Sequence, residues 1–306
     1  MGAIIFDSLL FEKIWGSDYF KREMKNTDND HIGEMWTLSA IENSETTAIN
    51  GKYAGKKLSE IYGDKSVFGE NKIDKFPVLV KLIATSDNLS VQVHPNDEYA
   101  RKNENSFGKT EGWLVADCDE SSKIVIGHKA KDRAAFENAI SEKKVMDMLN
   151  FTEVKKGDFY PIPSGTVHAI GKNLLIIEVQ QSSDITYRLY DYDRLDKNNK
   201  KRELHIQKAL DVISYDKYNE KTLNINKYDD VMVWDNNYFS VELKTINGEE
   251  EITTDDNYCM CSVVDGQLST EGINLYLCQS FIVPVNDKVK VYGNGKLFLV
   301  KSKISF

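Results

Sequence analysis

The sequence predicts a mainly β protein, a barrel or sandwich that carries a few helices on its surface. Short runs rich in β-branched and aliphatic residues recur along the chain and are bounded by Asn, Asp or Gly. Four of the clearest runs are 78–84, 123–127, 174–179 and 231–234. Strands that recur at short spacing with turn residues between them are typical of β sandwiches and barrels.

Two segments depart from the strand pattern and predict helices. In 132–149 and again in 203–213, apolar residues recur at the spacing of one helix face with charges between them. Such a face normally packs on a core, so we assign neither helix a chemical role. The polar run 196–202, just before the second helix, predicts an exposed connection.

Composition limits the classes of function. The formal net charge is −9, which argues against a nucleic-acid partner, because such a partner favours a basic face. No apolar run approaches the roughly 20 residues of a membrane span, and no leader pattern opens the chain, so we expect a cytoplasmic protein. The four cysteines are scattered and too few for a disulfide framework. An anionic small substrate would need a local cluster of Lys and Arg.

Four polar side chains in the first two thirds of the chain predict a metal site. Side chains at i and i+2 of a strand share a face, so Gln92 and His94 should point the same way, and Glu111 and His168 could complete the set. Two neutral imidazoles, a carboxylate and an amide oxygen suit a borderline divalent ion, and we expect zinc, with room left for a substrate oxygen. A single strand histidine is more often satisfied by an ordinary hydrogen bond, so the prediction depends on the joint pattern.

The segment around His168 refines the fold class. Its spacing Gly157-x5-Pro163-x-Gly165-x2-His168 resembles the second metal motif of the cupins, which are jelly-roll barrels. In physical terms, a strand ends in a turn that glycine and proline favour, and the chain re-enters a strand at the histidine. We therefore expect cupin-type barrels with the histidine aimed into the barrel mouth.

The length of the chain predicts two β domains. Residues 1–227 contain the four candidate ligands and both predicted helices, so we expect a metal-binding catalytic domain there. No histidine occurs after His205, although the composition stays typical of strands. Residues 228–306 should therefore form a metal-free, cupin-like β domain that covers one side or an edge of the first.

Over nearly its whole length the chain resembles the type I mannose-6-phosphate isomerases, in particular their short bacterial form. The resemblance is carried by the His168 segment and by residues 13–16, 33–40, 92–95, 109–111 and 181–191. The family usually has Gly-Gly after the first Trp, where this chain has Gly16-Ser17. The resemblance implies one Zn²⁺ per chain on Gln92, His94, Glu111 and His168.

The resemblance also implies reversible conversion of mannose 6-phosphate into fructose 6-phosphate. This reaction needs a base for the C2 proton and a means of stabilising the enediolate, which zinc can supply by polarising the sugar oxygens. Arg188 would add a fixed positive charge near the developing oxyanion, or it would be a surface or barrel-wall residue paired with Asp184 or Asp191. Glu178 and Lys109 are the other candidate catalytic residues, although Glu178 also fits a buried structural acid whose pKa burial would raise.

Phosphate recognition is expected from Ser90, Lys81 and Arg194, with Lys109 as a further candidate. Lys81 precedes Ser90 by nine residues, so an antiparallel hairpin could bring both to one barrel mouth. A hydroxyl beside a cation is ordinary phosphate chemistry. Each cation alone is more often a solvated surface charge, and for Arg194 the two possibilities are evenly balanced.

Two other functions fit the same residues. One is a cupin metalloenzyme of different chemistry, such as an iron-dependent dioxygenase or a sugar epimerase. An oxygenase would favour two histidines and one carboxylate without the extra glutamine. The other is a non-catalytic sugar-phosphate sensor. The sequence leaves open whether the chain is a monomer or a homodimer.

Overall fold

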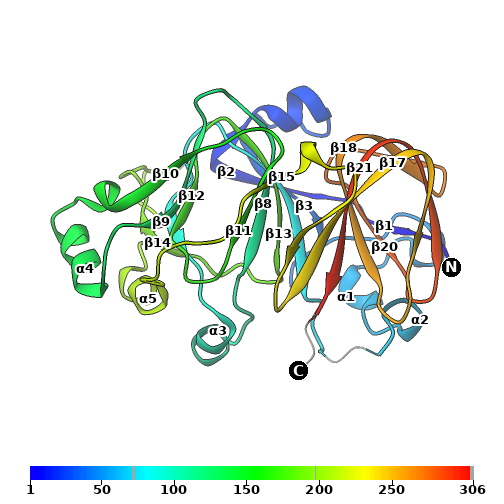
Figure 1. Cartoon of the computed structure of the whole chain (residues 1–306), viewed down its shortest axis with the longest axis horizontal. Coiled ribbons are helices and arrows are strands. Elements are labelled where there is room, and N and C mark those ends of the chain that lie inside the picture. The colour runs from blue at the N-terminus through cyan, green and yellow to red at the C-terminus, as the bar shows by residue number, and fades with distance from the viewer. Residues whose placement is uncertain (71–72, 197, 304–306) are drawn as a thin grey trace.

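Antiparallel β strands dominate the molecule, a computed structural model that describes residues 1–70, 73–196 and 198–303 (Figure 1). Nearly all strands belong to three sheets, which we call the outer, central and C-terminal sheets. The mainly β fold class is therefore confirmed.

The outer sheet is formed, in spatial order, by β10 (Leu149–Glu153), β9 (Lys123–His128), β12 (His168–Ile170), β7 (Val91–Val93) and β14 (Tyr187–Tyr190). The central sheet is formed by β15 (Leu223–Asn224), β11 (Asp158–Ile162), β8 (Glu111–Cys118), β13 (Leu174–Gln181), β6 (Val78–Ala84), β3 (Ile32–Leu38) and β2 (Leu9–Ser17). The C-terminal sheet is formed by β1 (Ile4–Ile5), β20 (Ser280–Val283), β18 (Cys259–Thr270), β21 (Lys288–Ser302), β17 (Phe239–Thr253) and β16 (Val231–Asp235), with β19 (Ile273–Leu275) pairing β18. A short hairpin joins β4 (Ala40–Ile41) and β5 (Ser44–Glu45).

Helices are few and short. They are α1 (Leu58–Ile61), α2 (Lys65–Phe68), α3 (Asp97–Glu104), α4 (Arg133–Ser141) and α5 (Ile206–Val212). Single 3₁₀ or π turns occupy Phe20–Met24, Gly51–Tyr53, Val145–Met148 and Ile225–Lys227. As Figure 1 shows, α4 and α5 lie at the end of the molecule far from the C-terminal sheet.

The sheets stack into layers because alternate residues of each strand face opposite sides. On β6, Val80 and Leu82 belong to the core shared with the C-terminal sheet, whereas Ile83 belongs to the core between the central and outer sheets. The outer face of the outer sheet packs on α4 and α5 through residues such as Phe136 and Leu210. The order of layers is therefore helices, outer sheet, central sheet, C-terminal sheet.

All four predicted strands are present, as β6, β9, β13 and β16. The predicted helices are shorter than expected. The first ends at Ser141 because Lys143 adopts a left-handed backbone (φ 58°), and Leu149 already pairs with His128 as a strand. The second begins only at Ile206.

The predicted hairpin between Lys81 and Ser90 is wrong. Strand β6 lies in the central sheet and β7 lies in the outer sheet, so the turn at 85–88 carries the chain from one sheet to the other. Both side chains nevertheless line one cavity, because the two sheets face each other.

The C-terminal sheet packs on the face of the central sheet that points away from the outer sheet. Its first strand, β1, comes from the N-terminus and pairs with β20. The division of the chain at residues 227 and 228 stays a prediction. Among the described residues, no helix is long and apolar enough to cross a membrane.

Candidate functional site

The candidate site lies between the outer and central sheets, and strand register brings its residues together. In the outer sheet, Gln92 on β7 stands opposite His168 on β12 and opposite Arg188 on β14. In the central sheet, Glu178 on β13 stands opposite Lys81 on β6. The same face of each strand thus points into the space between the sheets.

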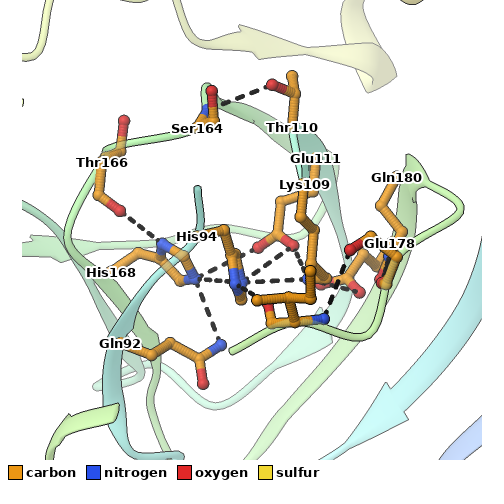
Figure 2. A network of polar contacts seen from close by, with 12 residues as sticks. Gln92, His94, Lys109, Thr110, Glu111, Ser164, Thr166, His168, Glu178 and Gln180 are labelled. Carbon is orange, nitrogen blue, oxygen red and sulfur yellow. Dashed lines mark hydrogen bonds and ion pairs between the residues drawn. The ribbon is translucent and has the colours of Figure 1, made fainter. Parts of the chain in front are cut away.

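Three potential ligands converge at the centre of this space (Figure 2). The ligand atoms of His94, Glu111 and His168 all lie within 4.8 Å of one another, and all three side chains are buried. The two Nε2 atoms are 3.1 Å apart, and they lie 3.5 and 3.4 Å from the Glu111 carboxylate.

Each histidine is oriented by its other ring nitrogen. Nδ1 of His94 donates to the carbonyl of Ile185 (2.7 Å), and Nδ1 of His168 donates to that of Thr166 (2.8 Å). Burial and the positive charge of Lys109 lower the pKa of both imidazoles, that of His168 to about 3. Both rings are therefore neutral at pH 7 with an Nε2 lone pair facing the centre, as metal ligation requires.

The Glu111 carboxylate also fits a cation. Within the described part of the chain, its buried Oε1 makes no hydrogen bond, while Oε2 contacts the ammonium of Lys109. Burial, reinforced by the negative charge of Glu178, raises the pKa of Glu111 to about 7. A divalent cation at the centre would favour the ionised carboxylate and use the free oxygen, so these residues fit the expected zinc ion.

Gln92 reaches the same centre with its amide. Its Nε2 lies 3.3 Å from Nε2 of His168, and its Oε1 accepts a hydrogen bond from Ser90 (3.4 Å). To ligate a cation, the side-chain amide of Gln92 would flip so that its oxygen, instead of its nitrogen, faces the histidines.

A row of alternating charges extends from the ligands along the central sheet. Nζ of Lys109 lies 3.8 Å from Oε1 of Glu178, and Nζ of Lys81 lies 3.4 Å from the same oxygen. Nζ of Lys81 also lies 4.0 Å from Oε2 of Glu34, and Oε1 of Glu34 lies 3.3 Å from Nζ of Lys13. Each buried charge in the row thus has an opposite neighbour.

These neighbours set the ionisation of the two buried acids. Burial favours the neutral form of Glu178, but Lys109 and Lys81 outweigh it and hold its pKa below the usual value. The elevated pKa that burial alone would give is therefore absent. Burial likewise opposes the ionised form of Glu34, and the charges of Lys81 and Lys13 overcome it and lower its pKa to about 2.

Arg188 is oriented by hydrogen bonds. Its Nε donates to Oγ of Ser90 (3.3 Å), and its Nη1 donates to the carbonyl of Glu203 (2.9 Å). Among the described residues it forms no ion pair within 4 Å, so the sequence-based alternative of pairing with Asp184 or Asp191 does not describe its closest contacts.

A cavity of about 260 Å³ opens beside these groups. Six predicted site residues are among those that line it: Lys81, Ser90, Gln92, Lys109, Glu178 and Arg188. The structure does not bring Arg194 to this wall. Arg194 instead pairs with Asp191 (2.7 Å) and Asp87 (3.1 Å), and its phosphate role stays a prediction.

Several residues of the wall were not expected from the sequence. Glu34 on β3 lines the cavity and alternates with Trp36, whose Nε1 donates to the Glu34 carboxylate (2.8 Å). That alternation inside a segment that resembles the family was the available signal. Arg202 also lines the cavity, although it belongs to the run that we interpreted as an exposed connection. Lys197 of that run lies outside the described residues.

Comparisons with known proteins agree with this fold and indicate a family. The family description "Phosphomannose isomerase type I, catalytic domain" matches residues 6–111, and "Mannose-6-phosphate isomerase, cupin domain" matches residues 230–302. The chain is 37% identical over 270 residues to mannose-6-phosphate isomerase ManA of Bacillus subtilis, covering 86% of each chain.

Two further relatives extend the agreement. The chain is 37% identical over 279 residues to mannose-6-phosphate isomerase of Streptococcus mutans, covering 89% of this chain and 88% of that protein. The crystal structure of a Bacillus subtilis mannose 6-phosphate isomerase superimposes with a TM-score of 0.87 at 34% identity, covering 98% of this chain and 99% of that one. The chain therefore belongs to the type I mannose-6-phosphate isomerase family.

Proposed function

We propose that this protein is a zinc-dependent isomerase that interconverts mannose 6-phosphate and fructose 6-phosphate. The observation that carries the proposal is the buried His94, Glu111 and His168 group, which stands beside a cavity lined by cationic side chains. The names of the relatives supply the sugar phosphate. One zinc ion per chain would be held by these three residues and Gln92.

When bound, zinc would act as a Lewis acid toward the carbonyl and hydroxyl oxygens at C1 and C2. The isomerisation moves a proton from C2 to C1, and the hydroxyl proton of O2 passes to O1 as the carbonyl moves from C1 to C2. Glu178 is placed for this step, because Oε2 is fixed by Nε1 of Trp113 (2.8 Å) while Oε1 makes no hydrogen bond among the described residues. Ionised Glu178 would take the C2 proton and return it to C1.

Two cationic residues would support this transfer. Lys109 contacts Glu111 and lies near Glu178, and its positive charge lowers the pKa of both carboxyl groups against the effect of burial. Arg188 stands opposite Gln92 and would offset the negative charge of the enediolate as it forms.

Turnover and metal content measured on one preparation test the proposal. Wild-type protein should contain about one zinc ion per chain and interconvert the two sugar phosphates. Treatment with a chelator should abolish turnover, and added zinc should restore it. His168→Ala should lose both metal and activity while its β-rich circular dichroism stays unchanged.

Other outcomes point to the two alternatives. Sugar-phosphate binding without turnover by the zinc-loaded protein would indicate a sensor. Turnover of a different sugar or of oxygen with a different metal would indicate a cupin enzyme of other chemistry. Oligomeric state and cytoplasmic location stay predictions.

A further inference from the structure

The charges on the cavity wall are unevenly compensated. Five cationic side chains line it, namely Lys13, Lys81, Lys109, Arg188 and Arg202. Each of the three lysines lies within 4.0 Å of a buried glutamate. Their charges are therefore already offset, and they have little attraction left for an anionic substrate.

The two arginines behave differently. Arg188 forms no ion pair within 4 Å among the described residues, and the charges that act on it are those of Arg202 and Arg194 and, with opposite sign, those of Asp191 and Glu203. Asp191, which is buried, is the carboxylate that binds both Arg202 and Arg194. Arg202 and Arg194 thus share the carboxylate of Asp191, and Arg194 has Asp87 (3.1 Å) as a second partner. Asp184 also lines the cavity. Among the described residues, Arg188 and Arg202 are the two cations of the wall that make no ion pair with a buried glutamate, so they are the ones left to attract an anion.

Arg202 is held in a fixed orientation. Its Nε donates to Oδ2 of Asp191 (2.7 Å) and its Nη2 contacts Oδ1, which is the forked arrangement that guanidinium and carboxylate groups favour. Its Nη1 makes no hydrogen bond within the part of the chain that the structure describes. Nη1 of Arg202 can therefore still donate a hydrogen bond to a ligand, while Asp191 already fixes the orientation of the guanidinium group.

The positions of the two arginines separate their roles. Arg188 stands opposite Gln92, which lies 3.3 Å from His168, so Arg188 adjoins the predicted metal ligands. Arg202 belongs to the segment between β14 and α5 and is anchored by Asp191. A hexose phosphate with its reacting carbons at the ligands would extend its phosphate away from them.

We propose that Arg202 binds the phosphate group of the substrate, that Asp191 is its positioning residue, and that Arg188 is thereby left to act at the reacting carbons. This inference rests on the proposed sugar-phosphate substrate and names a phosphate contact that the sequence analysis did not. From the sequence, this role was expected of Ser90, Lys81 and Arg194.

Arg202→Ala tests the proposal, with Lys201→Ala as its matched control. Lys201 is the neighbouring residue, carries the same charge, and points outward to pair with Asp193. Calorimetry should be used to measure the Kd of glucitol 6-phosphate, a hexitol phosphate that cannot isomerise. Losing one charge-assisted contact should weaken this binding by about 10- to 100-fold in Arg202→Ala, and Lys201→Ala should bind within about twofold of wild type.

Kinetics add a readout that a purely structural role would not produce. Arg202→Ala should raise the KM for mannose 6-phosphate while kcat at saturation falls by less than about threefold. Arg202→Lys should recover part of the binding, since it keeps the charge but not the fork. If thermal unfolding shows that Arg202→Ala folds poorly, Arg202→Lys serves as the variant that tests the site.

Unchanged binding of glucitol 6-phosphate by folded Arg202→Ala would overturn the proposal. Weaker binding in Arg194→Ala together with normal binding in Arg202→Ala would overturn it as well. A wild-type protein that binds glucitol 6-phosphate in an Arg202-dependent manner but does not convert mannose 6-phosphate would refute the proposed function and leave this inference standing.

Discussion

At the scale of single residues, the site is a set of charges whose neighbours decide what each can do. His94 and His168 are kept neutral by burial and by Lys109, whereas Glu178 and Glu34 are kept ionised by lysines that outweigh burial. Neutral imidazoles that could bind a metal thus lie beside ionised carboxylates that could accept a proton.

Arg188 provides a test of transition-state stabilisation. Its proposed partner is charge that appears only after the C2 proton has left, so Arg188→Ala should lower kcat by about a hundredfold with a modest change in KM. Steady-state kinetics with mannose 6-phosphate measure both quantities. An increase in KM with kcat unchanged would assign Arg188 to substrate binding instead.

Glu34 predicts a pH-dependent stability. Its pKa is lowered to about 2 in the folded protein, so its ionised form stabilises the fold above the ordinary glutamate pKa, and this contribution is lost as pH falls toward about 2. Glu34→Gln should therefore reduce the free energy of unfolding by about 3 kcal/mol at pH 7, because it leaves Lys81 with one buried partner fewer.

Denaturant unfolding of both proteins from pH 7 to pH 3 measures this difference. The difference in unfolding free energy between wild type and Glu34→Gln should become smaller as the pH falls. If this difference stays constant from pH 7 to pH 3, the contribution of Glu34 to stability does not come from its ionisation.

At the scale of elements, strand register assembles the site. Arg188, Gln92 and His168 stand side by side on β14, β7 and β12, and Lys81 and Glu178 stand side by side on β6 and β13. The turn before β12 links this arrangement to the rest of the site. Gly165 lies three residues before His168, and its backbone amide donates a hydrogen bond to the carbonyl of His94 (2.8 Å).

Gly165→Ala tests that turn. Gly165 has φ +86°, and an added Cβ would lie 3.0 Å from the carbonyl of Val212. A left-handed backbone costs an alanine about 1–2 kcal/mol, so we expect a loss of stability of that size together with weaker zinc retention. Gly63→Ala is the control, because its Cβ would enter open space. Equal effects of the two substitutions in thermal unfolding and zinc titration would contradict this role.

The sequence predicted the parts of the site that depend on local spacing. The alternation of Gln92 and His94 and the turn before His168 were readable because strand and turn geometry act over a few residues. The route between β6 and β7 was predicted wrongly, because a short connection between two strands fits a hairpin as well as a passage between facing sheets. Arg202 was missed because its partner Asp191 is reached through folding of the intervening loop.

At the scale of the whole molecule, the C-terminal sheet supports the site from behind. Phe298 on β21 and Phe159 on β11 are fully buried in the core that joins the C-terminal and central sheets, with ring centroids 5.9 Å apart. The central sheet thus has the site on one face and this core on the other. The sequence predicted a metal-free supporting region but not that β1 would join its sheet.

Phe298→Ala measures how strongly this core holds the layers together. Removing a fully buried phenylalanine leaves a cavity and should cost about 3–5 kcal/mol of unfolding free energy. Phe151→Ala, at a side chain that is 52% exposed, should cost far less. Chemical denaturation gives both values, and a loss below about 1 kcal/mol in Phe298→Ala would show that the interface contributes little.

The central claim is that the groups between the outer and central sheets move a proton between C2 and C1 of a sugar phosphate. Its most direct test is nuclear magnetic resonance of mannose 6-phosphate incubated in D₂O with zinc-loaded protein. The account predicts that fructose 6-phosphate forms and that deuterium accumulates at C1 over many turnovers, since the base exchanges its proton with solvent. Conversion without any deuterium uptake after prolonged equilibration, or no conversion at all by folded, zinc-loaded protein, would contradict it.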